Sequence, residues 1–128
     1  MGRTQRRILV AEDNPALSKI VSFTLERAGH LVTRAENGQE AWRIAQAQQF
    51  AMVVTDFQMP GMSGRQLCEL LRDCDEYRHV PIVMLTAKRY ELDVDALRQS
   101  LFISHVLEKP FSPIQLAALV EEQLALSS

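Results

Sequence analysis

Acidic side chains follow two apolar runs of the sequence, at the point where each run stops. Glu12 and Asp13 come directly after ILVA, and Asp56 comes directly after MVVT. Carboxylates that are brought close together repel one another, so the pKa of at least one rises unless a cation joins them. Oxygen ligands suit a hard cation such as Mg²⁺, which typically takes one or two carboxylates together with waters and phosphate oxygens.

Two further polar residues stand at the ends of later apolar runs. Thr86 follows IVML and offers a hydroxyl donor, and Lys109 follows VLE and offers a positive charge. Taken singly these residues are ordinary, because an aspartate after a strand is usually a turn or cap residue. Together, a metal, an ammonium group and a hydroxyl can hold a phosphoryl group. The four strand ends therefore indicate a phosphoryl-binding site.

The apolar runs predict five strands that alternate with five helices. Near-continuous aliphatic and β-branched runs are typical of parallel strands covered on both faces. Asn14 and Pro15 suit a helix start, and Gly29 suits its end. The predicted strands cover residues 7–12, 30–35, 51–55, 80–87 and 104–108. The helices are predicted between Asn14 and Gly29, over 39–48, 65–74 and 92–101, and after the cap formed by Ser112 and Pro113.

This alternation predicts an α/β fold, in which a parallel sheet carries helices on both faces. Ligands of such sheets bind beyond the carboxyl ends of the strands, where the strand order reverses. If the order is 2-1-3-4-5, the first and third strands are neighbours and Glu12, Asp13 and Asp56 converge in one pocket. No linker or repeat divides the chain, so residues 1–128 are expected to form one domain.

Composition restricts the partners that we expect. The 128 residues carry a net charge of −2, which argues against direct nucleic-acid binding. No apolar run approaches the ~18 residues that span a membrane. No signal peptide precedes the first strand, so we expect a cytoplasmic protein. Cys68 and Cys74 do not form a zinc motif and are expected to lie on one helix, and His30, His79 and His105 are expected at surface or turn positions.

The functional residues also carry a family resemblance. The pair Glu12-Asp13, the stretch DFQMPGMSG that begins at Asp56, Thr86-Ala87, and KPF at Lys109 together resemble the receiver domain of two-component response regulators. The resemblance covers nearly the whole chain. It implies a flavodoxin-like (βα)5 fold with the strand order 2-1-3-4-5, for which the chemotaxis regulator of this family is a standard example.

The resemblance also assigns roles. It implies that Asp56 accepts a phosphoryl group from a sensor histidine kinase or a histidine phosphotransfer protein, with Thr86 and Lys109 contacting that group. It implies that Glu12, Asp13, Asp56 and the backbone carbonyl of Gln58 hold Mg²⁺. The peptide bond between Lys109 and Pro110 is expected to be cis. Gln58 and Lys88 are expected beside the approach of the hydrolytic water.

The sequence departs from the family pattern near the output surface. Val106 replaces the usual Tyr or Phe, and the end of the fourth helix carries Leu101 and Phe102 without the usual glycine. The predicted function is that of a signalling receiver, which catalyses only its own phosphorylation and dephosphorylation. We expect a monomer or a weak phosphorylation-dependent dimer, and the sequence does not specify the downstream target.

Two alternatives are weighed against this function. One is a degenerate receiver that serves only as a protein-binding module. The other is an aspartyl-phosphate phosphatase of the haloacid dehalogenase type. That phosphatase class carries a second aspartate two residues after the nucleophile, where this chain has Gln58.

Overall fold

One parallel sheet forms the centre of the molecule. The computed structural model describes residues 6–87 and 93–127. The strand order β2-β1-β3-β4-β5 confirms the predicted order and fold class. The strands are β1 (Arg7–Ala11), β2 (Leu31–Ala35), β3 (Met52–Asp56), β4 (Ile82–Thr86) and β5 (His105–Glu108).

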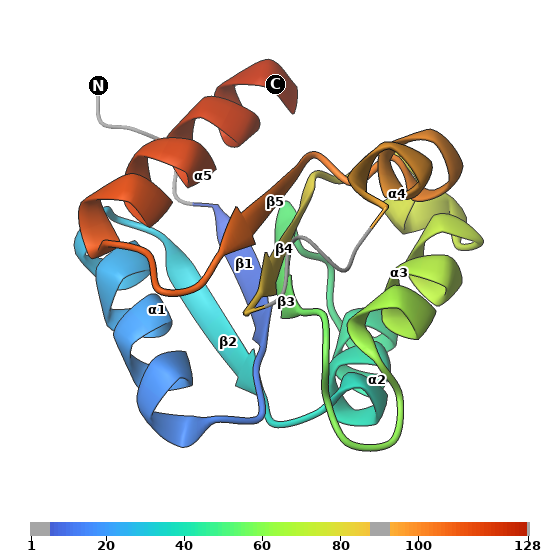
Figure 1. Ribbon diagram of the computed structural model, residues 1–128, viewed down its shortest axis with the longest axis horizontal. Helices are drawn as coiled ribbons and strands as arrows, with labels where there is room; N and C mark the ends of the chain where they lie inside the picture. The colour runs from blue at the N-terminus through green and yellow to red at the C-terminus, as the bar shows by residue number, and fades with distance from the viewer. Residues whose placement is uncertain (1–5, 88–92, 128) are drawn as a thin grey trace.

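Helices cover both faces of the sheet, as the alternating pattern predicted. Helices α1 and α5 lie together on one face, and α2, α3 and α4 lie on the other (Figure 1). The helices are α1 (Pro15–Arg27), α2 (Gly38–Ala47), α3 (Gly64–Arg72), α4 (Val94–Leu101) and α5 (Pro113–Ser127), with a short 3-10 helix, η1 (Asp75–Tyr77). Within residues 6–87 and 93–127, no helix is both long and apolar enough to cross a membrane.

Alternate residues of the central strands enter two separate cores. On β1, Ile8 and Val10 pack with α1 and α5, while Leu9 and Ala11 pack with α2 and α3. Both sets are fully buried, which is why the strands have continuous apolar sequences. The two cores fix the sheet between the helix layers and leave its carboxyl edge free to carry polar residues.

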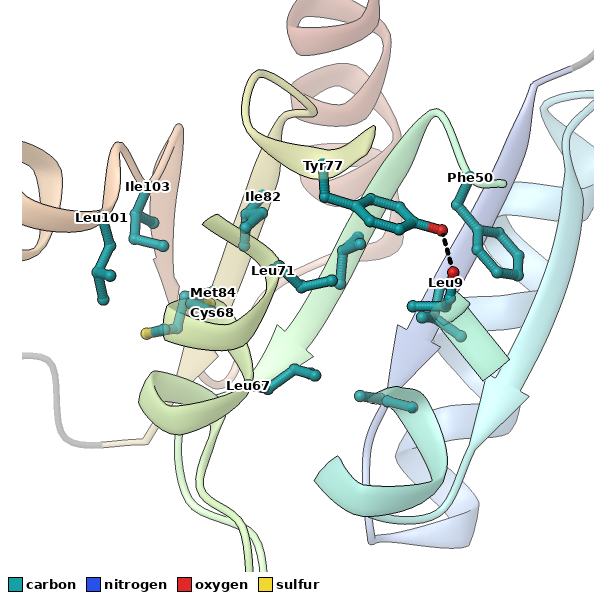
Figure 2. Packing of buried hydrophobic residues seen from close by; sticks show 14 of the residues in the cluster. Leu9, Phe50, Leu67, Cys68, Leu71, Tyr77, Ile82, Met84, Leu101 and Ile103 are labelled. Atoms are coloured by element: carbon teal, nitrogen blue, oxygen red, sulfur yellow. Dashed lines mark hydrogen bonds between the residues drawn. The ribbon is translucent and has the colours of Figure 1, made fainter. Parts of the chain in front are cut away.

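The third helix ends earlier than predicted. It stops at Arg72, so Cys74 lies outside it, directly before the unpredicted η1. Tyr77 of η1 is buried, and its hydroxyl donates to the carbonyl oxygen of Ala45 at 2.7 Å (Figure 2). The prediction was wrong because a tertiary contact decides the path of this segment: the Tyr77 ring is buried and its hydroxyl has a hydrogen-bond acceptor.

The expectation for His30 was also wrong. This residue is buried just before β2, and its Nε2 atom lies 2.8 Å from Oε1 of Glu121 on α5. The two residues are 91 positions apart in the chain. No local pattern marks such a pair, because the partner comes from the last helix of the fold.

The fourth helix ends in an unusual backbone conformation. The predicted start at Leu92 lies outside the described residues, and the side chain of Asp93 caps the helix by accepting from the amide of Ala96. After Leu101, Phe102 adopts φ 53° and ψ 40°, the left-handed conformation that glycine usually supplies at this place. For a residue with a side chain this conformation costs about 1–2 kcal/mol.

Candidate functional site

Three carboxylates converge at the carboxyl edge of the sheet. Asp56 is the last residue of β3, and Glu12 and Asp13 directly follow the neighbouring strand β1. One oxygen from each carboxylate lies within 4.8 Å of those of the other two. The structure therefore brings together the three acidic residues that the sequence predicted to meet.

Lys109 joins two of these carboxylates. Its Nζ atom lies 3.0 Å from Oδ1 of Asp56 and 3.1 Å from Oε1 of Glu12. The Asp56 side chain is 8% exposed and that of Lys109 is 22% exposed, so the pair is partly shielded from water. One ammonium group thus contacts two buried acids, while Asp13 stays exposed at the rim.

Neighbouring backbone groups hold these side chains in place. The amide of Asn14 donates to Oε2 of Glu12 at 3.1 Å, so both oxygens of Glu12 have a partner. Asn14 also caps α1 with its side chain. The amide of Lys109 donates to the carbonyl of Thr86 at 2.8 Å, which links the ends of β4 and β5. The Lys109-Pro110 peptide bond is cis, as the resemblance implied.

The site holds more negative charge than its lysine neutralises. Burial raises the pKa of Asp56 above its ordinary value, although the hydrogen bond and charge of Lys109 oppose the shift. Burial also raises the pKa of Glu12, and the charge of Asp56 adds to this increase. Burial by itself lowers the pKa of Lys109, but the hydrogen bond and charge of Asp56 outweigh it, so the net shift is upward.

The donor set fits a magnesium ion. All three groups are carboxylates, the hard oxygen ligands that Mg²⁺ prefers, and in the described part of the chain Lys109 is the one cation paired with them. Burial is the main cause of the raised pKa values of Glu12 and Asp56, and repulsion among the carboxylates adds to it; a divalent ion among them would offset both effects. Gln58 is exposed on the loop after Asp56, and its carbonyl remains a predicted ligand.

Thr86, a further predicted site residue, lies at the end of a strand, where the sequence predicted it. Thr86 is the last residue of β4, is buried, and its strand pairs with β3. Lys88 lies outside the described residues.

No site role was predicted for Gly64, yet this residue shapes the site. Gly64, the first residue of α3, lies so close to Asp56 that an added Cβ would be 2.1 Å from the Asp56 carbonyl oxygen. The start of α3 is fixed by a capping box between Ser63 and Gln66. The pattern S-x-x-Q in the sequence is the signal that could have located this helix start.

The geometry and the family pattern agree. A family model described as the response regulator receiver domain matches residues 8–121. The chain belongs to the response regulator receiver family. Receiver domains are signalling modules of two-component systems, and this chain has their fold and strand order.

Individual relatives come from three kinds of protein. A chemotaxis protein CheY homolog from Campylobacter jejuni is 32% identical, with 95% of each chain covered. The sensor histidine kinase GacS of Pseudomonas protegens is 40% identical over 89% of this chain. The chain spans 13% of that kinase and about half (47%) of the transcriptional regulator PhoP of Bacillus subtilis.

A solved structure is similar to the whole domain. The receiver domain of sensor histidine kinase PA1611 from Pseudomonas aeruginosa is 27% identical, with a TM-score of 0.86 and coverage of 95% of this chain and 99% of that one. That structure contains a magnesium ion coordinated in its active-site cleft. Membership in this family, together with the Glu12-Asp13-Asp56 cluster, supports an acidic magnesium-binding cleft here.

Proposed function

We propose that this receiver domain accepts a phosphoryl group on Asp56 from a phosphohistidine of a sensor histidine kinase or a histidine phosphotransfer protein. Glu12, Asp13, Asp56 and the Gln58 carbonyl would hold Mg²⁺. The observation that carries this proposal is the convergence of three carboxylates around one lysine. The domain would work in the cytoplasm and switch an output surface.

The transfer step follows from the position of Asp56. One of its oxygens attacks phosphorus, the P–N bond to the donor imidazole breaks, and the electron pair stays on the ring nitrogen. The end of a buried strand holds the attacking oxygen in one place, which favours in-line attack. Bound Mg²⁺ would supply neutralisation of the phosphoryl charge.

Lys109 and Thr86 act on the transferred group. Lys109 already contacts Asp56, so its ammonium group can follow the negative charge from the carboxylate to the phosphoryl oxygens. Thr86 ends the adjacent strand and would donate its hydroxyl to a phosphoryl oxygen, forming a charge-assisted hydrogen bond. This bond would draw Thr86 toward Asp56 and start the conformational change.

An apolar face beside the site suits the donor protein. Helix α1 begins two residues after Asp13 and α5 begins four residues after Lys109. Exposed Ile20, Phe23 and Ile114 line a hollow of about 570 Å³ between these helices. A donor protein docked there would reach the adjacent carboxyl edge of the sheet. Phe23→Asp should slow transfer from a phosphohistidine protein while transfer from acetyl phosphate stays unchanged.

The deciding experiment is phosphorylation in vitro. The chain is incubated with Mg²⁺ and acetyl phosphate, and its intact mass is measured. The wild type should gain one phosphoryl group and Asp56→Asn should gain none. Equal labelling of the variant would refute the assignment of Asp56. Lack of labelling of the wild type by both acetyl phosphate and a phosphohistidine protein would favour the binding-only receiver.

A further inference from the structure

An exposed aromatic ring stands at a strained backbone position. Phe102 has φ 53° and its residue is 68% exposed. The other described residues with positive φ are Gly29 and Gly61. Glycine would end α4 at lower cost, and an exposed ring contributes little to the core. A strained residue that the fold does not need points to a function for its side chain.

Phe102 borders a hollow at the amino-terminal edge of the sheet, at the opposite end of the strands from Asp56. Pro81 directly precedes β4 and Ser104 directly precedes β5, and both line this hollow. Its volume is about 540 Å³. We call it the basal hollow, and its lining is formed by Arg72, Arg78, His79, Val80, Pro81, Phe102, Ser104, Gln123 and Leu126.

Among the described residues, the lining of the basal hollow includes two arginines and a histidine but no acidic side chain, although the whole chain carries a net charge of −2. Arg78 and His79 are exposed. Arg78 contacts Asp75 at 2.5 Å, but both side chains are more than half exposed, and such a pair contributes little. The field in the hollow therefore favours a negatively charged ligand.

Arg72 adds a positive charge, and within residues 6–87 and 93–127 no carboxylate forms a salt bridge with it. Its guanidinium group donates only to backbone carbonyl oxygens, at distances from 2.6 to 3.2 Å; these belong to Tyr77, Arg78, Val80, Leu101 and Phe102. Through these bonds Arg72 ties the end of α4 to α3 and to the segment before β4. The wall that carries Phe102 is thus held firmly, which suits a preformed binding surface.

We propose that the basal hollow binds an acidic segment of a partner protein. An apolar side chain of that segment would contact Phe102 and Leu126, which are 68% and 75% exposed, and its carboxylates would face Arg78 and His79. Aromatic and arginine side chains are the residue types that most often dominate such interfaces. This site is separate from Asp56, and its binding does not depend on the proposed phosphorylation.

A single-stranded nucleic acid is the less suitable ligand. Aromatic rings and cations also bind nucleic acids, but that mode needs a positively charged groove along the backbone. Among the described residues, the lining of the basal hollow carries Phe102 but no Tyr or Trp, so successive bases would have no second such ring on which to stack.

Defined peptides provide the test. The test probes are fluorescein-labelled decapeptides that carry Trp, Phe, Leu or Met at the centre and Asp and Glu elsewhere. They are compared with three controls: basic versions, acidic versions that carry Ser at the centre, and a ten-nucleotide oligothymidine. Anisotropy measures affinity, and amide NMR shifts locate binding. At least one acidic peptide with an apolar centre should bind tenfold or more tightly than its basic and Ser versions, with shifts at Arg78, His79, Phe102 and Leu126.

Phe102→Gly separates binding from folding. It should weaken peptide binding at least tenfold while raising the melting temperature, because it relieves the left-handed strain. Arg78→Glu should also weaken binding, whereas Leu31→Ala, which alters an exposed apolar side chain on β2, should leave it unchanged. Four results would overturn the proposal: no shifts at the hollow with any acidic peptide, equal binding of basic peptides, tighter binding of oligothymidine, or a lower melting temperature of Phe102→Gly.

Discussion

Gly64 packs directly against the backbone of Asp56. Its amide donates to the carbonyl of Phe57 at 2.9 Å, and a Cβ on Gly64 would lie 2.1 Å from the Asp56 carbonyl oxygen. The start of α3 therefore fixes the backbone that carries the phosphoacceptor candidate. A larger side chain at position 64 must therefore displace either α3 or the backbone of Asp56.

Gly64→Ala should damage both the fold and the site. We expect a loss of roughly 1–3 kcal/mol of unfolding free energy, the range for overpacking in a tight interior, together with slower labelling by acetyl phosphate. Urea unfolding and intact mass measure the two effects. Gly29→Ala is the control. A Cβ on Gly29 would meet no neighbouring atom, but its φ of 99° is unfavourable for alanine, so this variant should be less stable than the wild type. Its folded protein should be labelled at the wild-type rate. Normal labelling of Gly64→Ala would show that the contact does not shape the site.

Magnesium should stabilise the fold through Asp13. An ion that binds the native state adds about 2.7 kcal/mol of stability when its concentration is one hundred times its dissociation constant. Melting curves with millimolar Mg²⁺ and with EDTA should differ for the wild type and coincide for Asp13→Asn. Glu122→Gln removes an exposed acid on α5 and should keep the full effect of the metal. A wild-type melting temperature that is the same with Mg²⁺ and with EDTA would contradict the proposed ligand set.

The charge of Asp56 should oppose folding at neutral pH. Burial raises its pKa in the folded state, so the folded protein binds the proton more readily than the unfolded chain does. Without metal, Asp56→Asn should therefore be more stable than the wild type at pH 7. The difference should shrink as the pH falls through the raised pKa of Asp56, because the wild-type carboxyl becomes neutral. Thermal melts at a series of pH values test this. A stability difference between Asp56→Asn and the wild type that grows as the pH falls would contradict the raised pKa of Asp56.

The lifetime of the phosphorylated state should depend on the loop after Asp56. The family resemblance places Gln58 and Lys88 beside the approach of the hydrolytic water, and Gln58 is exposed there. Replacing both side chains by Ala should change the hydrolysis rate without removing phosphorylation. Loss of the labelled mass over time measures the rate. An unchanged rate in the double variant would exclude both side chains from control of the water.

Phosphorylation should alter α4. In relatives with an aromatic residue at the position of Val106, the ring turns inward when the threonine moves. Val106 is 3% exposed, packs in the same core as Leu97 and Leu101 of α4, and is too short for that role. We expect hydrogen exchange in Val94–Leu101 to change when beryllofluoride mimics the phosphoryl group. A change in hydrogen exchange that is confined to β5 would contradict the proposed coupling from Asp56 to α4.

Local sequence patterns determined most of the fold and the site. Continuous apolar runs, caps and glycines located the strands and helices, because a parallel sheet covered on both faces demands those patterns. The same runs placed Glu12, Asp13, Asp56 and Thr86 at strand ends. The family resemblance supplied the strand order, and with it the expectation that the carboxylates meet.

Tertiary structure decided what depends on residues distant in the chain. It paired His30 with Glu121, ended α3 before Cys74, and placed Lys109 between Glu12 and Asp56. It also brought Arg72 to the carbonyls that end α4 and pressed Gly64 against Asp56. These contacts join elements that approach only when both cores are packed, so their geometry cannot be read from propensity or periodicity in one segment.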